Sequence, residues 1–412
     1  LGSGATWEYS TDNGVTWTVG TGSTFTLTGD GLKTVAVRQS DIAGNISATG
    51  SLSFTLDTAA PVGPTLSLVN DTGLSKSDGI TSNGSVNVVG LGSGATWEYS
   101  TDNGVTWTAG SGSSFTLTGD GLKSVLVKQT DLAGNTSANS SVLNFNLDTT
   151  APTDISWIGT PPSSDTALPG TANSGTLATL SSVDAQSTSG FVYSLANTSS
   201  PGFAVSSDGT VSYSGTAMAA STTYILNIQS MDNAGNIFTK SYTVKTGSAN
   251  ADTALTASSG NTIIYGGDGA DSITGSSGSD WIFGQGGNDT LIGGGGKDYL
   301  YGGSGNDSFK YTALADSASL ASADIIYDFV EGGTDKMDVS AIDASTKTSS
   351  KDDAFGFVAT ASTGVTANSI TWYKDTANNR TIVQADNNGD TTADMVIILN
   401  GLHNLATTDF VL

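Results

Sequence analysis

The sequence predicts an all-β chain in which β-sandwich modules precede a parallel β-roll and a β-rich C-terminal cap. Three observations predict it: 53 Gly in 412 residues, a repeat of about 90 residues, and a tandem nine-residue repeat. Ser and Thr are abundant and helix formers other than Ala are scarce, which favours strands and turns. With 37% hydrophobic residues the chain can also build cores, so a disordered tail is excluded.

The 90-residue repeat defines the first two domains. Residues 1–51 recur at 91–141 with 40 identities, and the linkers LDTAAP (56–61) and LDTTAP (147–152) follow the two copies. A period near 90 built from short alternating strands is typical of a β-sandwich array. We therefore expect 1–56 to be part of one module and 57–148 to be a complete one.

Each copy contains the segment WEYSTDNGVTWT, which predicts a hairpin around an Asp-Asn-Gly turn. Its tryptophans could form a sugar-binding platform, but alternating aromatic residues in a strand are more often core. We interpret all four as core: Trp7, Trp17, Trp97 and Trp107.

Residues 149–247 predict a further sandwich, with strands in FVYSL, GTVSY and TTYILNIQSMDNAGN. The DTxAP linkers and the DxAGN turns at Asp41–Asn45, Asp131–Asn135 and Asp232–Asn236 (DNAGN) resemble bacterial Ig-like and cadherin-like adhesin repeats. That resemblance implies calcium near module junctions, with these ligands: Asp57, Asp71, Asp78, Asp131, Asp148, Asp154, Asp184 and Asp232. Asx turns and strand ends are the alternative interpretation.

The strongest pattern runs from Gly266 to Lys310 as five consecutive nonapeptides. Position eight is always apolar, and position six is always Asp: Asp271, Asp280, Asp289, Asp298 and Asp307. The pattern resembles the calcium-binding β-roll repeat of RTX proteins. Two degenerate units, 248–256 and 257–265, precede it and carry Thr at position six, so we expect a roll over 248–310 that begins without the main ligand.

The spacing has a physical reason. Two nonapeptides complete one coil, so units i and i+2 stack and enclose a cation between their turns; five units give about three such pairs. Asp supplies an anionic oxygen, and Ca²⁺ accepts six to eight oxygens in flexible geometry. Glycines let backbone carbonyls face the ion. The glycines at positions one and four are assigned to the site: Gly266, Gly269, Gly275, Gly278, Gly284, Gly287, Gly293, Gly296, Gly302 and Gly305.

Metal binding and folding are expected to be coupled in this segment. Without calcium, stacked carboxylates repel and the Gly-rich turns cost conformational entropy. The segment should therefore stay unfolded in a calcium-poor cytosol and fold in a calcium-rich medium. Such behaviour suits export of an unfolded chain.

The last part, 311–412, resembles the cap and type I secretion signal region of RTX adhesins. In DIIYDFVEGGTDKMDVSAID (324–343) this implies that Asp328, Asp335 and Asp338 terminate the roll or bind a last ion; an acidic surface turn is the alternative. Further on, the spacing 1, 3, 5, 9 resembles a calcium loop, with a plain Asn-Gly hairpin as its competitor. The residues at those positions are Asp386, Asn388, Asp390 and Asp394.

Charge and composition restrict the partners. With 38 acidic and 14 basic residues the net charge is −24, which argues against nucleic acid and anionic membranes. No apolar run approaches the length of a membrane span. Cysteine is absent, as suits an exported bacterial protein, although its absence alone decides nothing. The expected partners are calcium, the type I secretion machinery, and a receptor or glycan bound outside this segment.

Enzymatic function is not expected. The chain has a single histidine, His403, so neither a zinc-protease HExxH motif nor a Ser-His-Asp triad away from the C-terminus can be built. The sequence predicts a calcium-rigidified stalk and secretion region of an extracellular cell-surface adhesin that supports adhesion and biofilm formation. The alternative is the C-terminal RTX region of a secreted hydrolase whose catalytic domain lies upstream.

Overall fold

The computed structural model describes residues 2–158, 175–196, 200–214, 218–257, 259–345 and 353–412. Across these residues the regular structure is β-strands with two short 3₁₀ helices, which confirms the all-β prediction. The chain forms two compact units, residues 1–150 with 233–236 and residues 151–232 with 237–412. Within the described residues, no helix has the length and apolar character needed to cross a membrane.

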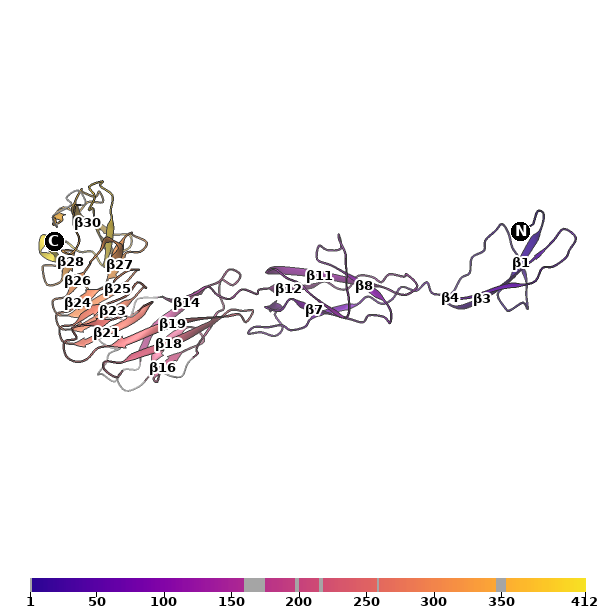
Figure 1. The fold of residues 1–412 in the computed structure, drawn as a ribbon, viewed down its shortest axis with the longest axis horizontal. Helices are drawn as coiled ribbons and strands as arrows, with labels where there is room; N and C mark the ends of the chain where they lie inside the picture. Colours follow the sequence, from indigo (N-terminus) through magenta and orange to yellow (C-terminus); the bar gives the residue numbers. More distant parts are fainter. Residues whose placement is uncertain (1, 159–174, 197–199, 215–217, 258, 346–352) are drawn as a thin grey trace. The chain divides into compact units, whose positions relative to one another are not determined.

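The first unit contains the complete module 57–148, which is a two-sheet sandwich (Figure 1). One sheet has the order β10-β7-β5 and the other β6-β12-β11-β8-β9. Alternating apolar residues put Val86, Val125, Phe145 and Leu147 between the sheets, where each is at most 2% exposed. The strands are β5 (Thr65–Leu68), β6 (Ile80–Thr81), β7 (Ser85–Val89), β8 (Thr96–Ser100), β9 (Thr108–Ala109), β10 (Ser114–Thr116), β11 (Gly121–Thr130) and β12 (Leu143–Leu147).

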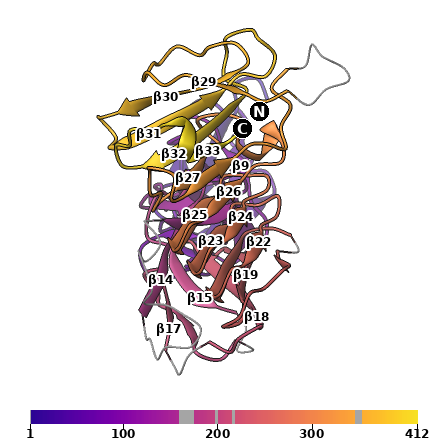
Figure 2. The ribbon, with the colours of Figure 1, turned by 90° about the vertical axis from the view of Figure 1, so that its left-hand side faces the viewer.

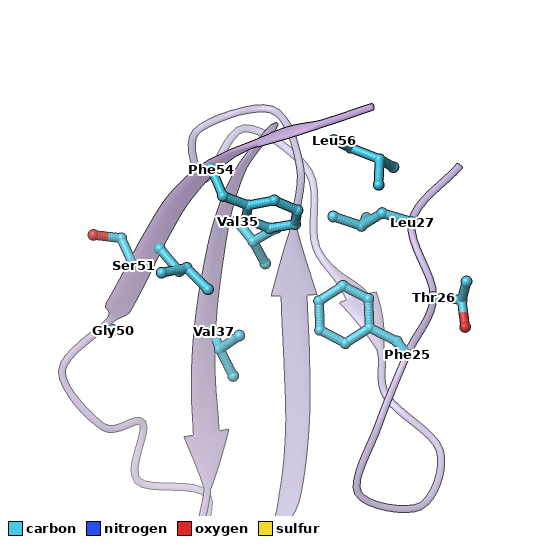
Figure 3. A pocket seen from close by; sticks show the side chains of 10 residues that line it. Phe25, Thr26, Leu27, Val35, Val37, Gly50, Ser51, Phe54 and Leu56 are labelled. Carbon is cyan, nitrogen blue, oxygen red and sulfur yellow. The ribbon is translucent and has the colours of Figure 1, made fainter. Parts of the chain in front are cut away.

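Residues 1–56 contain the counterparts of the later strands of that module: β1 (Thr6–Ser10), β2 (Thr18–Val19), β3 (Gly31–Ser40) and β4 (Gly50–Leu56). Phe25, Val35 and Phe54 lie together on an open apolar face, as Figure 3 shows. Phe54 is 38% exposed, whereas its counterpart Phe145 is 2% exposed. In the complete module the equivalent face packs against β5 and β7.

The predicted hairpin is confirmed, because β1 pairs with β2 and β8 pairs with β9 in antiparallel register. The interpretation of its tryptophans was half wrong. Trp7 and Trp97 are buried, but Trp17 and Trp107 are only half-buried on the outer face. Their rings are covered by cations instead, with the Arg38 guanidinium 3.9 Å from the Trp17 ring centroid and the Lys128 ammonium 4.2 Å from that of Trp107.

In the second unit, the strands between Asp154 and Thr246 form another sandwich. One sheet has the order β13-β14-β17-β16 and faces strands β15, β18 and β19. The strands are β13 (Asp154–Ile158), β14 (Gly175–Val183), β15 (Val192–Leu195), β16 (Phe203–Val205), β17 (Thr210–Tyr213), β18 (Thr223–Met231) and β19 (Ile237–Thr246). The sheet does not end at β19, because β19 pairs in parallel with the first long strand of the roll, β21 (Thr262–Asp268).

The roll consists of two facing parallel sheets, whose strands Figures 1 and 2 show stacked in sequence. One sheet continues through β21, β23 (Trp281–Gly286), β25 (Tyr299–Ser304) and β27 (Asp324–Ile326). The other contains β20 (Leu255–Thr256), β22 (Ser272–Thr274), β24 (Thr290–Ile292), β26 (Ser308–Lys310) and β28 (Lys336–Asp338). Ile264 pairs with Ile282 and Ile282 with Leu300, so one coil is 18 residues, or two nonapeptides, as the sequence predicts.

The apolar position-eight residues form the core between these sheets, and Ile273, Ile282, Leu291, Leu300 and Phe309 are at most 1% exposed. This core continues into the cap without a break. The cap elements are η1 (Leu314–Ser317), β29 (Gly356–Phe357), β30 (Ser369–Asp375), β31 (Arg380–Ala385), β32 (Met395–Asn400), η2 (Thr407–Asp409) and β33 (Phe410–Val411). Strands β32 and β33 extend the two sheets of the roll beyond β27 and β28.

Candidate metal centre

The position-six aspartates line two rows of turns, one at each edge of the roll. In the first row, Oδ1 of each carboxylate accepts the backbone N–H of the position-six residue one coil earlier. The N–H groups of Asp271, Asp289 and Asp307 donate to Asp289, Asp307 and Asp335 at 2.8, 2.9 and 3.0 Å. These bonds fix each carboxylate in the gap between two stacked turns.

The second row repeats this arrangement. The N–H groups of Thr262, Asp280 and Asp298 donate to Oδ1 of Asp280, Asp298 and Asp324 at 2.6, 2.8 and 2.9 Å. Asp324 completes the row although 26 residues separate it from Asp298, because the segment containing η1 is inserted into this coil.

The other oxygen of these carboxylates, Oδ2, often has no hydrogen-bond partner. Among the described residues, five of them are buried without any hydrogen-bond partner: Oδ2 of Asp271, Asp289, Asp298, Asp307 and Asp324. Each of the five residues is at most 3% exposed. An unpaired buried carboxylate oxygen is costly, so a set of them favours a positive partner, whether a proton on each carboxylate or a shared metal ion.

The glycine at position one makes room beside that oxygen. A Cβ atom on Gly284, Gly293 or Gly302 would lie 2.3–2.4 Å from Oδ2 of the aspartate in the same turn. On Gly266 it would also lie 2.5 Å from the carbonyl oxygen of Gly284, one coil further on. Carboxylate and carbonyl oxygens therefore face the same space, which any larger residue at position one would fill.

At positions two and four of the nonapeptide, the backbone takes positive φ angles and the carbonyl of the preceding coil comes close. Gly287 and Gly305 have φ values of 121° and 142°, and a Cβ on Gly305 would lie 1.6 Å from the carbonyl oxygen of Gly287. The carbonyls thus point along the stack toward the next turn. One position-two residue, Gln285, adopts φ 82° although it is not glycine, and its buried Oε1 has no partner within the described part of the chain.

The electrostatics of the turns agree with their geometry. Burial, with neighbouring carboxylates adding to it, raises the pKa of Asp289 to about 7, of Asp298 to about 8 and of Asp307 to about 6. Burial also raises the pKa of Asp324 well above its ordinary value. Ionising these groups near neutral pH therefore requires a positive partner.

These residues fit calcium. In the described residues no three acidic or imidazole side chains converge on one point, so an ion would be held by one or two carboxylates together with backbone carbonyls. An all-oxygen set of this kind is what Ca²⁺ prefers. It lacks the sulfur and nitrogen ligands typical of zinc.

Two residues of the ladder escaped the sequence analysis. Asp324 lies outside the nonapeptide count, as described above. The other is Asp252: its N–H donates to Asp271 Oδ1 at 2.7 Å, so Asp252, and not Thr253, occupies position six of the first turn. The expectation that both degenerate units lack the carboxylate was therefore wrong for the first and correct for the second, where Thr262 takes the place. Counting 19 residues back from Asp271 instead of 18 would have found Asp252.

The predicted residues after the repeats differ in what they contact. Asp335 belongs to the first row, and its Oδ2 accepts the Val330 N–H at 2.8 Å. Asp328 accepts the N–H groups of Gly302 and Gly303 at 3.0 and 2.8 Å. Asp338 lies 3.4 Å from the Lys310 ammonium.

In the loop after β31, carboxylates meet backbone amides. Asp386 accepts N–H groups from Gly389 and Thr391 at 2.6 and 2.5 Å. Burial raises its pKa, but the bonds from Gly389, Asn368 and Thr391 outweigh burial and leave the pKa below its ordinary value. Asp394 accepts the Asn387 N–H and the Asn388 side chain at 3.0 Å each. Asp390 is exposed and accepts the Thr392 N–H at 2.7 Å.

In the sandwiches, four of the eight predicted junction residues form Asx-type turns. Oδ1 of Asp57, Asp78 and Asp131 accepts nearby N–H groups from Ala59, Ile80 and Asn135 at 3.1, 3.0 and 2.8 Å. Oδ1 of Asp184 accepts two amides of its own turn.

The remaining junction residues have other surroundings. Asp154 binds the Lys240 ammonium at 2.7 Å. Asp148 and Asp232 are fully buried. Oδ2 of Asp71 accepts the Gly79 N–H at 2.9 Å, while Oδ1 of Asp71 and Oδ2 of Asp184 are buried and unpaired among the described residues.

The roll and cap are similar to a known protein family. Residues 259–412 match the family described as Peptidase M10 serralysin C terminal. This region is therefore a C-terminal domain of the RTX type, and domains of this type belong to secreted, calcium-binding proteins. No curated protein matches the chain.

Several solved structures are similar to parts of the chain. The AlgE6R3 subunit of the Azotobacter vinelandii mannuronan C5-epimerase is 26% identical over 39% of this chain and 82% of its own, with TM-score 0.29. A tetra-tandem repeat from the extending region of a large adhesion protein is 18% identical over 59% and 66%, with TM-score 0.21. Fibronectin(III)-like modules of Clostridium thermocellum CbhA are 12% identical over 44% and 94%, with TM-score 0.27. TM-scores this low carry no inference about function.

Proposed function

We propose that this chain is a calcium-dependent extracellular segment of a bacterial surface adhesin. Its sandwich modules serve as a stalk, and its roll and cap form a region that is exported unfolded by a type I system and folds outside the cell. The whole protein would support cell adhesion and biofilm formation, with the receptor or glycan bound outside this segment.

The observation that carries the calcium part is the row of buried carboxylate oxygens without partners. Five such groups in stacked turns would repel one another in the absence of a cation, whereas bound calcium would compensate them. Because an unfolded chain has no preformed site, the binding free energy becomes folding free energy. Millimolar calcium outside the cell would then drive folding after export.

The adhesin part rests on the array of sandwich modules with its 90-residue repeat. We propose further that the chain itself is not catalytic. His403, its single histidine, has Nε2 2.9 Å from the Asn400 carbonyl oxygen and Nδ1 3.6 Å from Glu331, a pairing that suits a structural role in the cap.

A calcium titration of the full 412-residue chain tests the folding claim. Far-ultraviolet circular dichroism in EGTA should show less β-structure, and calcium added in excess should restore it. Magnesium at the same concentration serves as the control, because it prefers octahedral geometry and keeps its waters. A spectrum that does not change with calcium would refute calcium-dependent folding.

A second candidate function is the C-terminal region of a secreted hydrolase, which the family match favours because serralysins are M10 peptidases. The complete reading frame distinguishes the two. Many further 90-residue repeats upstream would support the adhesin, and a compact domain with a catalytic motif would support the hydrolase.

A further inference from the structure

We propose that calcium binding in the roll also stabilises the adjoining sandwich, whose strands lie between Asp154 and Thr246, so that sandwich and roll fold as one calcium-dependent unit. The coupling acts through a shared hydrophobic core and needs no ion in the sandwich itself. This inference rests on the proposed calcium binding of the roll. It extends that dependence to a region without nonapeptides and leaves the module 57–148 independent of calcium.

The two sheets of the roll have different outer faces. In the units that form β22, β24 and β26, position seven of the nonapeptide is Ser or Thr: Ser272, Thr290 and Ser308. In the units that form β21, β23 and β25, positions seven and nine are large and apolar or aromatic: Ile263, Tyr265, Trp281, Phe283, Tyr299 and Tyr301. Because side chains alternate along a strand, these residues point away from the position-eight core. One sheet of the roll therefore has an outer face that is stable only when it is covered.

The sandwich covers much of this face. Ile263, Tyr265, Trp281 and Phe283 are at most 8% exposed, whereas the position-seven residues of the other sheet are only half-buried. The four residues belong to one core with side chains of the sandwich, which include Ile155, Leu226, Tyr242 and Val244. The hydrophobic core of the sandwich thus extends onto the roll.

Three aromatic rings connect the two parts directly. The ring centroid of Trp157, on strand β13 of the sandwich, lies 5.9 Å from that of Trp281 on strand β23 of the roll. Trp157 also meets Tyr242 of β19 edge-on, with 4.7 Å between the ring centroids. Two strands of the sandwich and one strand of the roll therefore share a single aromatic cluster.

The sheet of the sandwich also continues into the roll. Strand β19 pairs in parallel with β21 from Thr243 and Thr262 to Thr246 and Tyr265, and Figure 1 shows the two strands in neighbouring positions. Val244, within the paired segment, is fully buried. If β21 unfolded, one edge of β19 would lose its partner strand and Val244 would lose its cover on that side.

The strands of the roll that enter this core are held by the calcium turns. The Thr262 N–H, at the start of β21, donates to Asp280 Oδ1 at 2.6 Å, and the Asp280 N–H donates to Asp298 Oδ1 at 2.8 Å. Trp281 directly follows Asp280 in the sequence. Repulsion between ionised carboxylates in the absence of calcium would therefore release β21 and β23, and with them the side chains that complete the sandwich core.

The coupling acts in both directions. Because linkage is reciprocal, a sandwich that is stabilised by the calcium-bound roll raises the calcium affinity of the roll by the same factor. Burial of one large apolar side chain changes an equilibrium constant by roughly 10- to 100-fold, so a core shared in this way is sufficient to couple the two parts.

Hydrogen exchange with mass spectrometry on the full chain measures the first direction. Removal of calcium with EGTA should speed amide exchange in 223–246, which contains β18 and β19, by about tenfold or more. This change should accompany the loss of protection in 259–310. The module 57–148 is the internal control, and its exchange should stay the same.

The variant Trp157→Ala measures the second direction, because Trp157 lies in the sandwich and outside every calcium turn. Loss of its contact with Trp281 should raise the calcium midpoint of folding, followed by circular dichroism, by about fivefold. Trp107→Ala is the matched control, since Trp107 is also a half-buried tryptophan but lies in the module 57–148. It should shift the midpoint less than about twofold.

The outcomes distinguish the coupling from the proposed function. Unchanged exchange in 223–246 while 259–310 loses its protection, or equal midpoints for Trp157→Ala and Trp107→Ala, would overturn the coupling and leave the calcium binding of the roll intact. If EGTA had no effect on 259–310 either, the proposed function would be refuted and the coupling with it.

Discussion

The sandwich module 57–148 and the roll contain aspartates in tight Gly-rich turns, but the carboxylates have opposite environments. In the module, Asp102 accepts the Ser100 hydroxyl at 2.7 Å and the Thr106 N–H at 2.8 Å, and bonds led by the Thr106 hydroxyl lower its pKa to about 2. In the roll, burial raises the pKa of Asp289 to about 7, and its Oδ2 is unpaired among the described residues.

This difference shows that an aspartate in a turn is not by itself a metal ligand. Asp102 is satisfied by its own turn and needs no ion, whereas five turns of the roll each leave one carboxylate oxygen buried and unpaired among the described residues. Asp71 and Asp184 share the arrangement of the roll, since each pairs one oxygen and leaves the other buried and unpaired among the described residues, although both residues are only half-buried.

Calcium removal should separate the two regions with the largest effect. At 100 times its dissociation constant, each ion stabilises the folded state by about 2.7 kcal/mol. Several such sites together match the roughly 5–15 kcal/mol stability of a typical domain. EGTA should therefore abolish amide protection in 259–310 and leave it unchanged in 57–148, as followed by hydrogen exchange with mass spectrometry. An equal loss of amide protection in both regions would show that the roll does not depend on calcium more than the sandwich does.

A methyl group beside the carboxylate should have the next largest effect. In Gly293→Ala the Cβ would lie 2.4 Å from Asp298 Oδ2, whereas in Gly295→Ala its nearest neighbour would be 3.8 Å away. Overpacking of this kind costs about 2 kcal/mol, equivalent to roughly a thirtyfold rise in the calcium midpoint. Gly295→Ala is the matched control and should shift the midpoint less than about twofold. Similar midpoints for the two variants would show that position one is not beside the ion.

Removing one charge should have a smaller effect. Asp289→Asn keeps the shape of the side chain and its Oδ1 acceptor but lacks the anionic ligand, so the calcium midpoint should rise by about tenfold, or about 1.4 kcal/mol. Asp102→Asn makes the same change in the sandwich and should leave the midpoint unchanged. Isothermal titration calorimetry on the full chain measures both, and a shift in Asp102→Asn equal to that in Asp289→Asn would argue against the assignment.

The pH dependence should be the smallest effect and should differ in sign with and without calcium. Folded-state pKa values of about 7 for Asp289 and 8 for Asp298 lie above the ordinary value of 3.8. The calcium-free roll is therefore most stable below about pH 4 and loses stability as pH rises through 7 to 8. With calcium, acidification raises the midpoint severalfold because protons compete for the carboxylates.

Circular dichroism in EGTA at pH 5 and pH 8 measures the first part of this prediction, with more β-structure expected at pH 5. The Asp102 turn provides the contrast, because its pKa of about 2 means that its contribution is lost only as pH falls from about 4 toward 2. A calcium-free roll that gained structure as the pH rose would contradict the burial of its carboxylates.

The sequence predicts the fold and most of the site because both depend on a strict period. Asp at position six and an apolar residue at position eight recur every nine residues, and the 18-residue coil follows from that spacing. Asp252 and Asp324 could not be found in this way, since one inserted residue and the η1 insertion displace them from the count. Only the hydrogen bonds between neighbouring coils identify them as position-six residues.

Spacing alone was also less informative in the loop after β31. Asp386 and Asp394 have ligand-like spacing, yet the structure places backbone N–H groups against their oxygens. Whether a carboxylate oxygen is paired depends on how the loop closes, and local sequence does not determine that. The same holds for Trp17 and Trp107, whose burial depends on a cation supplied by a neighbouring strand.

The most direct test of the central claim is X-ray diffraction from crystals of the full chain grown in calcium, with anomalous differences used to locate the ions. We expect peaks between stacked turns, about 2.3–2.6 Å from carboxylate oxygens of the roll and from backbone carbonyls. The unpaired oxygens expected there are Oδ2 of Asp271, Asp289, Asp298, Asp307 and Asp324, and no peak is expected beside Asp102. Turns without peaks, with water or protein donors bonded to those five oxygens, would contradict it.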